Sequence, residues 1–369
     1  MLKQEIRQYF LIVIFLLLLL GFTSCLRSNL NNNNQYSERV ITDMLDREVV
    51  IPERITKIVA VNPGALRLMV YMDLTKSISG VEDIEKRPGR AYAMANPSLT
   101  KKEIIGPAMG GDPELITFNN PDIIFTTFST KGEADDLEAQ TGIPVVGLNT
   151  GDFYTNRKTF YNSLNIIGEV TGRSKRADSI IAFIKREINE LQKINSKSSS
   201  NKKSIYIGGV SYSGARGLTS TVPKYESFEF INAKNVAANL TSLKNNPSNT
   251  ASTIDLEQLI LWNPNYLFID AAGLSLTKPQ IKRETPAGKT LQAIENNSIH
   301  TLMPYNWYST NFETILANSW FAASVLHPDI VSQKKFEKRI RNIFNVMLGK
   351  DVSKELKEMY QGWINITKE

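Results

Sequence analysis

A long amphipathic segment near the middle of the chain constrains the fold more than any other feature. Residues 174–197 carry apolar side chains three and four positions apart, the period of one helical face: Ala177, Ile180, Ile181, Ile184, Ile188, Leu191 and Ile194. Ser174 is a favourable N-cap, and the polar run SKSSSNKK at residues 196–203 ends the pattern. Such a helix rises roughly 36 Å, enough to connect two domains. Taken alone, the pattern fits a surface helix of one large α/β domain equally well.

The segments on the two sides of this helix share one pattern. PELITFNNPDIIF (residues 113–125) and DLEQLILWNPNYLFI (residues 255–269) each run from an acidic residue through a helical turn and an Asn/Pro break into an apolar strand. The chain has 369 residues, which is long enough for two domains. Two similar α/β lobes joined by one helix are therefore the simplest architecture.

Short apolar runs and helical periods alternate along both flanks. Residues 40–51 are predicted to form a hairpin. Buried strands are predicted at residues 55–61, 77–81, 142–148, 204–210, 265–270 and 299–303. Helices are predicted at residues 155–170, 228–240, 311–326 and 332–348. This alternation is typical of parallel sheets covered by helices.

The first 25 residues are typical of a secretory signal peptide. Lys3 and Arg7 precede an uninterrupted apolar run at residues 11–20, which is too short to span a bilayer. Cys25 is the only cysteine, so no disulfide can form within the chain. Residues 26–38 are rich in asparagine and lack any period, as expected of a flexible tether.

Composition and motifs argue against several functional classes. The net charge of +6 is modest, and no basic run is interleaved with aromatic residues, so nucleic-acid binding is not expected. His300 lies in a predicted strand and His327 at a helix end, and no His/Cys cluster could hold a bare metal ion. No G-x-S-x-G elbow is present and no G-x-G-x-x-G motif follows a strand. An enzyme is therefore not expected.

The order and spacing of the segments resemble a known family, the helix-bridged (class III, siderophore/cobalamin type) substrate-binding proteins of bacterial ABC importers. The matching segments include RVITDMLDREVVIPERITKIVAVNPGA (residues 39–65), GGDPELITFNNPDIIF (110–125), GIPVVGL (142–148), IIGEVTGRSKRADSIIAFI (166–184), STIDLEQLILWNPNYLFID (252–270) and PAGKTLQAIENNSIHTLMPYNWYSTNFE (286–313). The resemblance implies an α/β fold with two similar lobes, central mostly parallel sheets, one long rigid bridging helix and a ligand cleft between the lobes. It places the N-terminal lobe at residues 39–172, the helix at 173–197 and the C-terminal lobe at 198–369.

The N-terminal region resembles that of bacterial lipoproteins. Thr23 and Ser24 precede Cys25 as in a lipobox, with Phe22 where leucine is usual. The resemblance implies that Cys25 is lipidated and becomes the mature N-terminus. The protein would then be held in the periplasm or at the cell surface by a lipid anchor in the membrane.

Candidate ligand-binding residues follow from the rule that ligands of open α/β sheets lie at the carboxyl ends of strands. The rule selects loops after predicted strands, with the cluster at residues 305–308 the most distinctive because its aromatic side chains could stack on a flat ligand. The predicted set is Asn62, Arg87, Arg90, Tyr92, Ser129, Tyr212, Arg216, Tyr305, Asn306, Trp307 and Tyr308. Pro63, Thr127, Ser211, Asp270 and Asn311 belong to the same loops.

The cargo follows only in part from these residues. The three arginines and the positive net charge favour an anionic metal chelate, with a ferric siderophore as the first choice. Cobalamin, haem, molybdate and tungstate stay open, because related proteins carry each of them. No resident cofactor is expected. A lipid-anchored scaffold or adhesin without a small ligand is the alternative from another class.

The resemblance also implies a partner, an ABC permease dimer with its ATPase subunits. In the family, one acidic residue on each lobe contacts arginines of the permease. The matching positions are Glu114 and Glu257, each at the start of a predicted helix. An ordinary solvated glutamate, stabilised by the helix dipole, is the alternative for each position. A monomer is expected.

Overall fold

The N-terminal lobe of the computed structural model is built on a five-stranded parallel sheet. The model describes residues 39–153, 155–196, 203–211, 214–240 and 251–367. The sheet order is β5 (Glu103–Ile104), β4 (Ile78–Val81), β3 (Ile58–Val61), β6 (Ile123–Thr126) and β7 (Val145–Gly147). All residues of β3 and β6 are buried, as expected of central strands covered on both faces. A hairpin of β1 (Arg39–Thr42) and β2 (Glu48–Ile51) precedes the sheet, as predicted.

Helices connect these strands, and a loop follows the carboxyl end of each strand. They are α2 (Ala65–Tyr71), α3 (Ala91–Ala95), α4 (Pro113–Asn119), α5 (Lys131–Thr141) and α6 (Arg157–Thr171), with 3₁₀ turns at Asp83–Lys86 and Leu99–Lys101. Asp112 caps α4, because its side chain accepts hydrogen bonds from two backbone amides of the first turn. Thr130 and Glu133 form a capping box at the start of α5.

The C-terminal lobe repeats the plan with a four-stranded parallel sheet. Its order is β10 (Lys234–Asn235), β8 (Ser204–Gly208), β12 (Tyr266–Asp270) and β13 (Ile299–Leu302). A short antiparallel pair, β9 (Ser220–Thr221) and β11 (Ser252–Thr253), lies outside this sheet. The helices are α8 (Glu226–Glu229), α9 (Leu256–Trp262), α10 (Leu274–Gln280), α11 (Pro286–Thr290), α12 (Gln292–Glu295), α13 (Phe312–Leu326), α14 (Gln333–Leu348) and α15 (Ser353–Tyr360), with a 3₁₀ turn at Ala271–Gly273.

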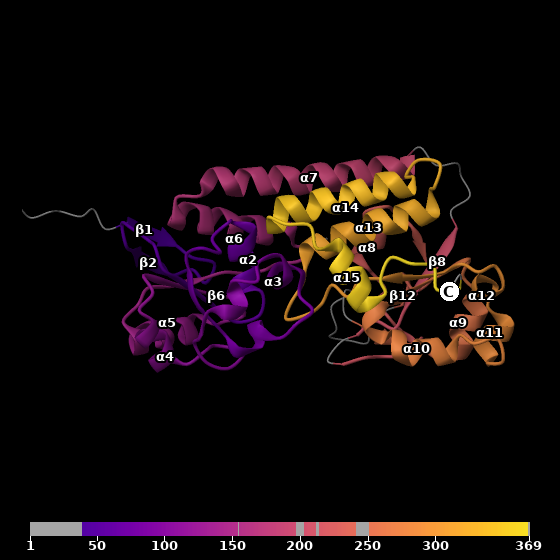
Figure 1. Cartoon of the computed structure of the whole chain (residues 1–369), viewed down its shortest axis with the longest axis horizontal. Helices are drawn as coiled ribbons and strands as arrows, with labels where there is room; N and C mark the ends of the chain where they lie inside the picture. The colour runs from indigo at the N-terminus through magenta and orange to yellow at the C-terminus, as the bar shows by residue number, and fades with distance from the viewer. Residues whose placement is uncertain (1–38, 154, 197–202, 212–213, 241–250, 368–369) are drawn as a thin grey trace, which may run out of the picture. The chain divides into compact units, whose positions relative to one another are not determined.

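The predicted long helix is present as α7 (Ser174–Ser196), and it lies beside two helices of the C-terminal lobe. Figure 1 shows α7, α14 and α13 running along one another. Arg176 on α7 donates to the carbonyl oxygens of Tyr71 in α2 and Val346 in α14. One hydrophobic core therefore continues from the first sheet through these helices to the second, and all of it lies within the compact unit Val40–Glu369.

One predicted helix, residues 228–240, is wrong. Within this range only Phe228 and Glu229, the last two residues of α8, are helical, and the chain then turns through Asn232, whose φ of 47° is left-handed. Phe228, Phe230 and Ile231 are buried without helical spacing. The Asn235 side chain donates to the carbonyl oxygens of Val222 and Pro223, which fixes a turn instead.

Several sequence predictions lie outside the described residues. These are the signal peptide at residues 1–25 with Cys25, the tether at residues 26–38, and Tyr212. Within the ranges that the structure does describe, no helix is long and apolar enough to cross a membrane.

Candidate functional site

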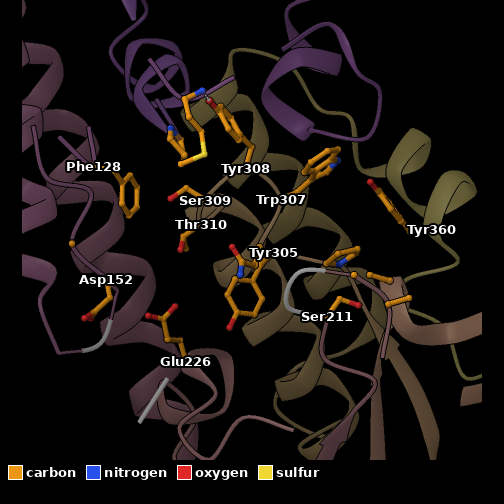
Figure 2. Close-up of a pocket in the computed structure, with 18 residues that line it drawn as sticks. Phe128, Asp152, Ser211, Glu226, Tyr305, Trp307, Tyr308, Ser309, Thr310 and Tyr360 are labelled. Atoms are coloured by element: carbon orange, nitrogen blue, oxygen red, sulfur yellow. Dashed lines mark hydrogen bonds between the residues drawn. The ribbon is translucent and has the colours of Figure 1, made fainter. Parts of the chain in front are cut away.

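A cavity of about 1030 Å³ is lined by residues of both lobes. The N-terminal lobe contributes Met109, Phe128 and Asp152, which lie in loops after strands of the first sheet. The C-terminal lobe contributes Glu226 and the run from Pro304 to Thr310 after β13. Figure 2 shows these side chains around the cavity, with Tyr305, Trp307 and Tyr308 along one wall. The cleft predicted between the lobes is therefore present, and the predicted cluster at residues 305–308 lines it.

This aromatic wall is held from behind by Arg67 of α2. The guanidinium is buried and donates to the carbonyl oxygens of Trp307, Tyr308 and Thr310 and to Oδ1 of Asn311. These hydrogen bonds connect the N-terminal lobe to the loop after β13. Arg67 thus fixes the backbone of the wall, and Asn311 supports the loop rather than facing the cavity.

Tyr308 extends from the C-terminal lobe to loops of the N-terminal lobe. Its hydroxyl donates to Oε2 of Glu82 at 2.7 Å and accepts from the Met109 amide at 3.1 Å. Burial raises the pKa of Glu82, and burial with the nearby Glu82 carboxylate raises the pKa of the Tyr308 hydroxyl. The backbone of Tyr308 is left-handed, with a φ of 50°. The next residue, Ser309, packs closely against Gly64. A Cβ added to Gly64 would lie only 3.3 Å from the Ser309 side chain.

Arg90 and Tyr92 are buried beneath the wall, so the prediction that they face the cargo is wrong for this arrangement. Arg90 donates to the carbonyl oxygens of Ile84 and Arg87 and pairs with Glu85 at 3.4 Å. The Tyr92 hydroxyl donates to the same Glu85 carboxylate at 2.6 Å. These internal partners keep both side chains away from the cavity. The Arg90 guanidinium lies 5.1 Å from the Trp307 ring and supports it from the protein side.

The other predicted arginines also do not line the cavity. Arg87 and Arg216 are exposed, and neither is among the residues that line it, although Gly214 and Ala215 are. Asp270 is buried behind the cavity, where it accepts hydrogen bonds from the backbone amides of Ala272 and Ser211. The reason is geometric. A strand end selects the loop that reaches the cleft, but not the direction of each side chain within it.

Asn62 and Ser129 lie in a smaller cavity of about 370 Å³ that shares Met109 and Phe128 with the large one. The Asn62 amide donates to the hydroxyls of Thr126 and Ser129, both at 3.0 Å. The structure therefore brings these two predicted residues together, beside the main cavity rather than in it. Thr127 is buried and donates to the Pro63 carbonyl.

Two acidic residues that the sequence interpretation missed line the large cavity. Glu226 is only 5% exposed, and its Oε1 accepts from the Phe153 amide at 3.0 Å. Burial, and to a smaller extent the Asp152 carboxylate, raise the pKa of Glu226 to about 7. Asp152 follows β7, so the strand-end rule could have selected it. Glu226 follows only the two-residue strand β9, which left no recognisable signal.

Tyr360 of α15 closes another side of the cavity. Its hydroxyl donates to the Gly89 carbonyl at 2.9 Å, which ties the end of the chain to the N-terminal lobe. Gly89 has a φ of 102°, and a Cβ there would collide with the Tyr360 hydroxyl. No sequence pattern placed this C-terminal helix at the cleft.

The two predicted docking glutamates are exposed at equivalent places. Glu114 lies in the first turn of α4 and Glu257 in the first turn of α9. Four residues later, each helix carries an exposed apolar side chain, Phe118 at 90% and Leu261 at 79% exposure. A residue four positions along a helix lies on the same face. Each lobe thus presents a carboxylate and an apolar group together.

Among the described residues, no group of three or more His, Cys, Asp or Glu side chains could hold a metal ion. The ring of His300 packs against those of Tyr266, Phe268 and Phe321. Burial lowers the pKa of His327.

Comparisons with known proteins agree with this architecture. A family model described as periplasmic binding protein matches residues 58–305. The molybdate-binding protein MolA of Haemophilus influenzae is 24% identical over 344 residues, which cover 87% of this chain and 93% of MolA. The solved structure of MolA bound to molybdate has a TM-score of 0.64 at 20% identity, covering 86% of this chain and 99% of its own.

Two further solved structures share the fold. A periplasmic solute binding protein from Veillonella parvula has a TM-score of 0.68 at 14% identity, covering 89% of this chain and 99% of its own. The petrobactin-binding protein YclQ from Bacillus subtilis has a TM-score of 0.58 at 17% identity, covering 79% and 99%. At these identities the likeness concerns the fold alone.

Proposed function

The chain belongs to the periplasmic binding protein family, and we propose on that basis that it captures a metal chelate and delivers it to a membrane permease without chemical turnover. It is a substrate-binding protein of the kind that serves ABC importers. Our first choice of cargo is a ferric siderophore, with cobalamin, haem, or molybdate and tungstate as alternatives.

The observation that carries this proposal is the cavity between the lobes. Its volume of about 1030 Å³ lies at the upper end of small-molecule sites. Two of the residues that line it present buried polar atoms that have no hydrogen-bond partner in the part of the chain that the structure describes, Oγ of Ser211 and Oε2 of Glu226. Such atoms are costly unless a ligand or water completes their hydrogen bonds. Their position together with the aromatic wall supports a bound cargo.

The size of the cavity favours a chelate over a bare oxyanion as cargo. The relative MolA is molybdate-binding. A tetrahedral oxyanion would fill a small part of a cavity of about 1030 Å³, and the arginines expected to hold an anion do not line it. A large complex with its own coordination shell would instead contact both lobes at once.

Native mass spectrometry of protein purified from its own host tests the proposal. We expect a bound metal complex that dissociates on denaturation. A thermal-shift series against siderophores, corrinoids, haem and oxyanions should then give a saturable gain in stability, RT ln(1 + [L]/Kd), for the matching class. A protein that carries no small molecule and responds to none of these classes would favour a lipid-anchored scaffold instead.

We propose further that Cys25 carries a lipid anchor that holds the mature protein to the membrane. The apolar run at residues 11–20, the small residues before Cys25 and the asparagine-rich residues 26–38 support this. Cys25→Ser should release the protein from membrane fractions and leave its melting temperature unchanged. If fractionation is the same for both proteins, this part of the proposal is wrong.

The proposed partner is an ABC permease dimer with its ATPase subunits, bound by the monomeric protein. We propose Glu114 and Glu257 as the docking residues, one on each lobe. Their exposure, their place in the first turns of α4 and α9, and the neighbouring Phe118 and Leu261 support this role. A two-lobed protein that binds a two-subunit permease needs one contact per lobe.

A further inference from the structure

The charge of the large cavity has one sign. Two acidic side chains, Asp152 and Glu226, line it, and none of its described lining residues is arginine, lysine or histidine. The two carboxylates are close enough for Asp152 to raise the pKa of Glu226. Figure 2 shows both side chains at one end of the cavity, near Tyr305.

Glu226 has an unused hydrogen-bonding position at the cavity. The residue is 5% exposed, and its Oε2 atom is buried without a hydrogen-bond partner among the described residues. The other oxygen, Oε1, accepts from the Phe153 amide. A buried acceptor of this kind is costly unless a donor fills it. A cargo with a positively charged or N–H group would supply that donor.

Two arginines around the cavity, Arg157 and Arg67, already have hydrogen-bond partners. Arg157 donates to the Phe153 carbonyl at 2.8 Å, and its guanidinium lies 5.5 Å from the Phe230 ring. It lowers the pKa of Glu226 slightly, but burial outweighs that effect. Arg67 donates to carbonyl oxygens behind the aromatic wall. Neither arginine lines the cavity, so neither is placed to contact an anionic cargo there.

The remaining wall suits a cation with an apolar body. Phe128 is 65% exposed at the cavity, and Tyr305, Trp307 and Tyr308 line the opposite side. The faces of aromatic rings attract cations, most strongly where water is excluded. The same faces offer apolar contact area to a large ligand.

We propose that the cargo is a cationic metal complex, bound with its positive group at Asp152 and Glu226 and its apolar surface on the aromatic wall. This inference rests on the proposed binding function and specifies its substrate class. It replaces the anionic cargo expected from the sequence, because the arginines behind that expectation do not line the cavity.

Two ions of matched size and opposite charge test whether the cavity prefers a cationic cargo. Tetraphenylphosphonium and tetraphenylborate have nearly the same shape and opposite charge, and each can be titrated into the mature protein by calorimetry. We expect saturable binding of tetraphenylphosphonium at least about tenfold tighter than of tetraphenylborate. Molybdate serves as the small-anion probe and should not compete with tetraphenylphosphonium.

Glu226→Gln assigns the preference to a residue. The amide keeps the size of the side chain and its acceptor for the Phe153 amide, and it should weaken tetraphenylphosphonium binding about tenfold. Glu229→Gln on the same helix is the control, because Glu229 does not line the cavity. A melting curve of each variant verifies folding.

Several outcomes would overturn the proposal. They are equal affinity for the two ions, preference for tetraphenylborate, competition by molybdate, binding of neither ion, or equal effects of the two glutamine variants. None of these outcomes would remove the proposed importer role, because native mass spectrometry of the protein from its own host and the permease-contact variants test that role without these ions.

Discussion

Trp307 lines the cavity, and its ring also lies 5.1 Å from the Arg90 guanidinium. If the ring stacks on the cargo, Trp307→Ala should weaken cargo binding by about 1–3 kcal/mol. The measurement is calorimetric titration with the complex recovered from the native protein, together with a melting curve. Loss of stability with unchanged affinity would instead assign Trp307 to the protein interior.

Trp262→Ala is the matched control for this variant. Trp262 is partly buried at the end of α9, and its ring lies 6.3 Å from that of Tyr206, in a separate hydrophobic cluster. Its removal should lower the melting temperature without changing cargo affinity.

Two buried carboxylic acids should make the stability of the fold depend on pH. Burial raises the pKa of Glu226 from 4.5 to about 7 and that of Asp270 from 3.8 to about 7. The folded state then binds these protons more tightly than the unfolded chain. Their contribution to stability is complete below the unfolded values and is lost as the pH rises through about 7. Chemical denaturation between about pH 5 and pH 8 should show the free energy of unfolding falling.

Substitution isolates the contribution of Glu226 to this dependence of the free energy of unfolding on pH. The groups that face it are Asp152, which raises its pKa, and Arg157 and the Phe153 amide, which lower it. Glu226→Gln removes the titrating group, so the variant should lose less stability over the same pH range, while Glu229→Gln should follow the wild type. Identical slopes in all three proteins would contradict the raised pKa.

Individual residues show how far strand-end reasoning reaches. It selected Tyr305 and Trp307, which line the cavity because β13 ends directly before their loop. It failed for Arg90, whose guanidinium binds carbonyl oxygens of its own loop. Sequence position does not reveal such local partners. It also missed Glu226, which no long strand precedes.

At the scale of elements, periodicity predicted helices well where one face is buried and the other exposed. All residues of α7, Ser174–Ser196, lie within the range predicted from the sequence, since its apolar spacing is regular. The prediction for residues 228–240 failed because buried positions such as Phe228 and Ile231 are interrupted by exposed ones such as Lys234 without a helical period.

Glu187 connects the three helices that lie beside one another, α7, α13 and α14. Its carboxylate accepts from Trp320 Nε1 at 2.9 Å and pairs with Arg339 at 3.0 Å, and the side chain is fully buried. Glu187→Ala should lower the free energy of unfolding by about 2–4 kcal/mol, because it leaves both donors without their acceptor. Urea denaturation measures this loss.

Glu190→Ala is the control on the same helix. Glu190 is partly exposed and pairs with Lys193 at the surface, so its loss should cost less than about 1 kcal/mol. Equal costs for the two variants would mean that Glu187 does not hold the helices together.

At the scale of the whole molecule, the repeated segments on either side of α7 predicted the two parallel sheets. The sequence could not show how closely the lobes are connected. Besides α7, helix α14 of the C-terminal lobe packs against α2 and α3 of the N-terminal lobe. Those contacts depend on pairs such as the Asn96 amide and the Leu348 carbonyl, which lie 252 positions apart.

The proposed docking to a permease uses both lobes at once, with one glutamate on each lobe. Glu114 and Glu257 are exposed in the first turns of α4 and α9, each one helical turn before an exposed apolar residue. An exposed ion pair contributes only about 0–1 kcal/mol. The two carboxylates should therefore set orientation and encounter rate more than affinity, while Phe118 and Leu261 supply contact area.

Reversal of both charges tests this role. Glu114→Lys with Glu257→Lys should abolish uptake and stimulation of the reconstituted transporter's ATPase, while calorimetry gives unchanged cargo affinity, because neither residue lines the cavity. Glu53→Lys with Glu284→Lys makes the same change in charge at exposed positions of the two lobes and should leave uptake intact. Survival of uptake in the docking variant, or an equal loss in the control, would contradict the assignment. A further change, Phe118→Ser with Leu261→Ser, should reduce uptake at saturating cargo, because it removes contact area while leaving the charges in place.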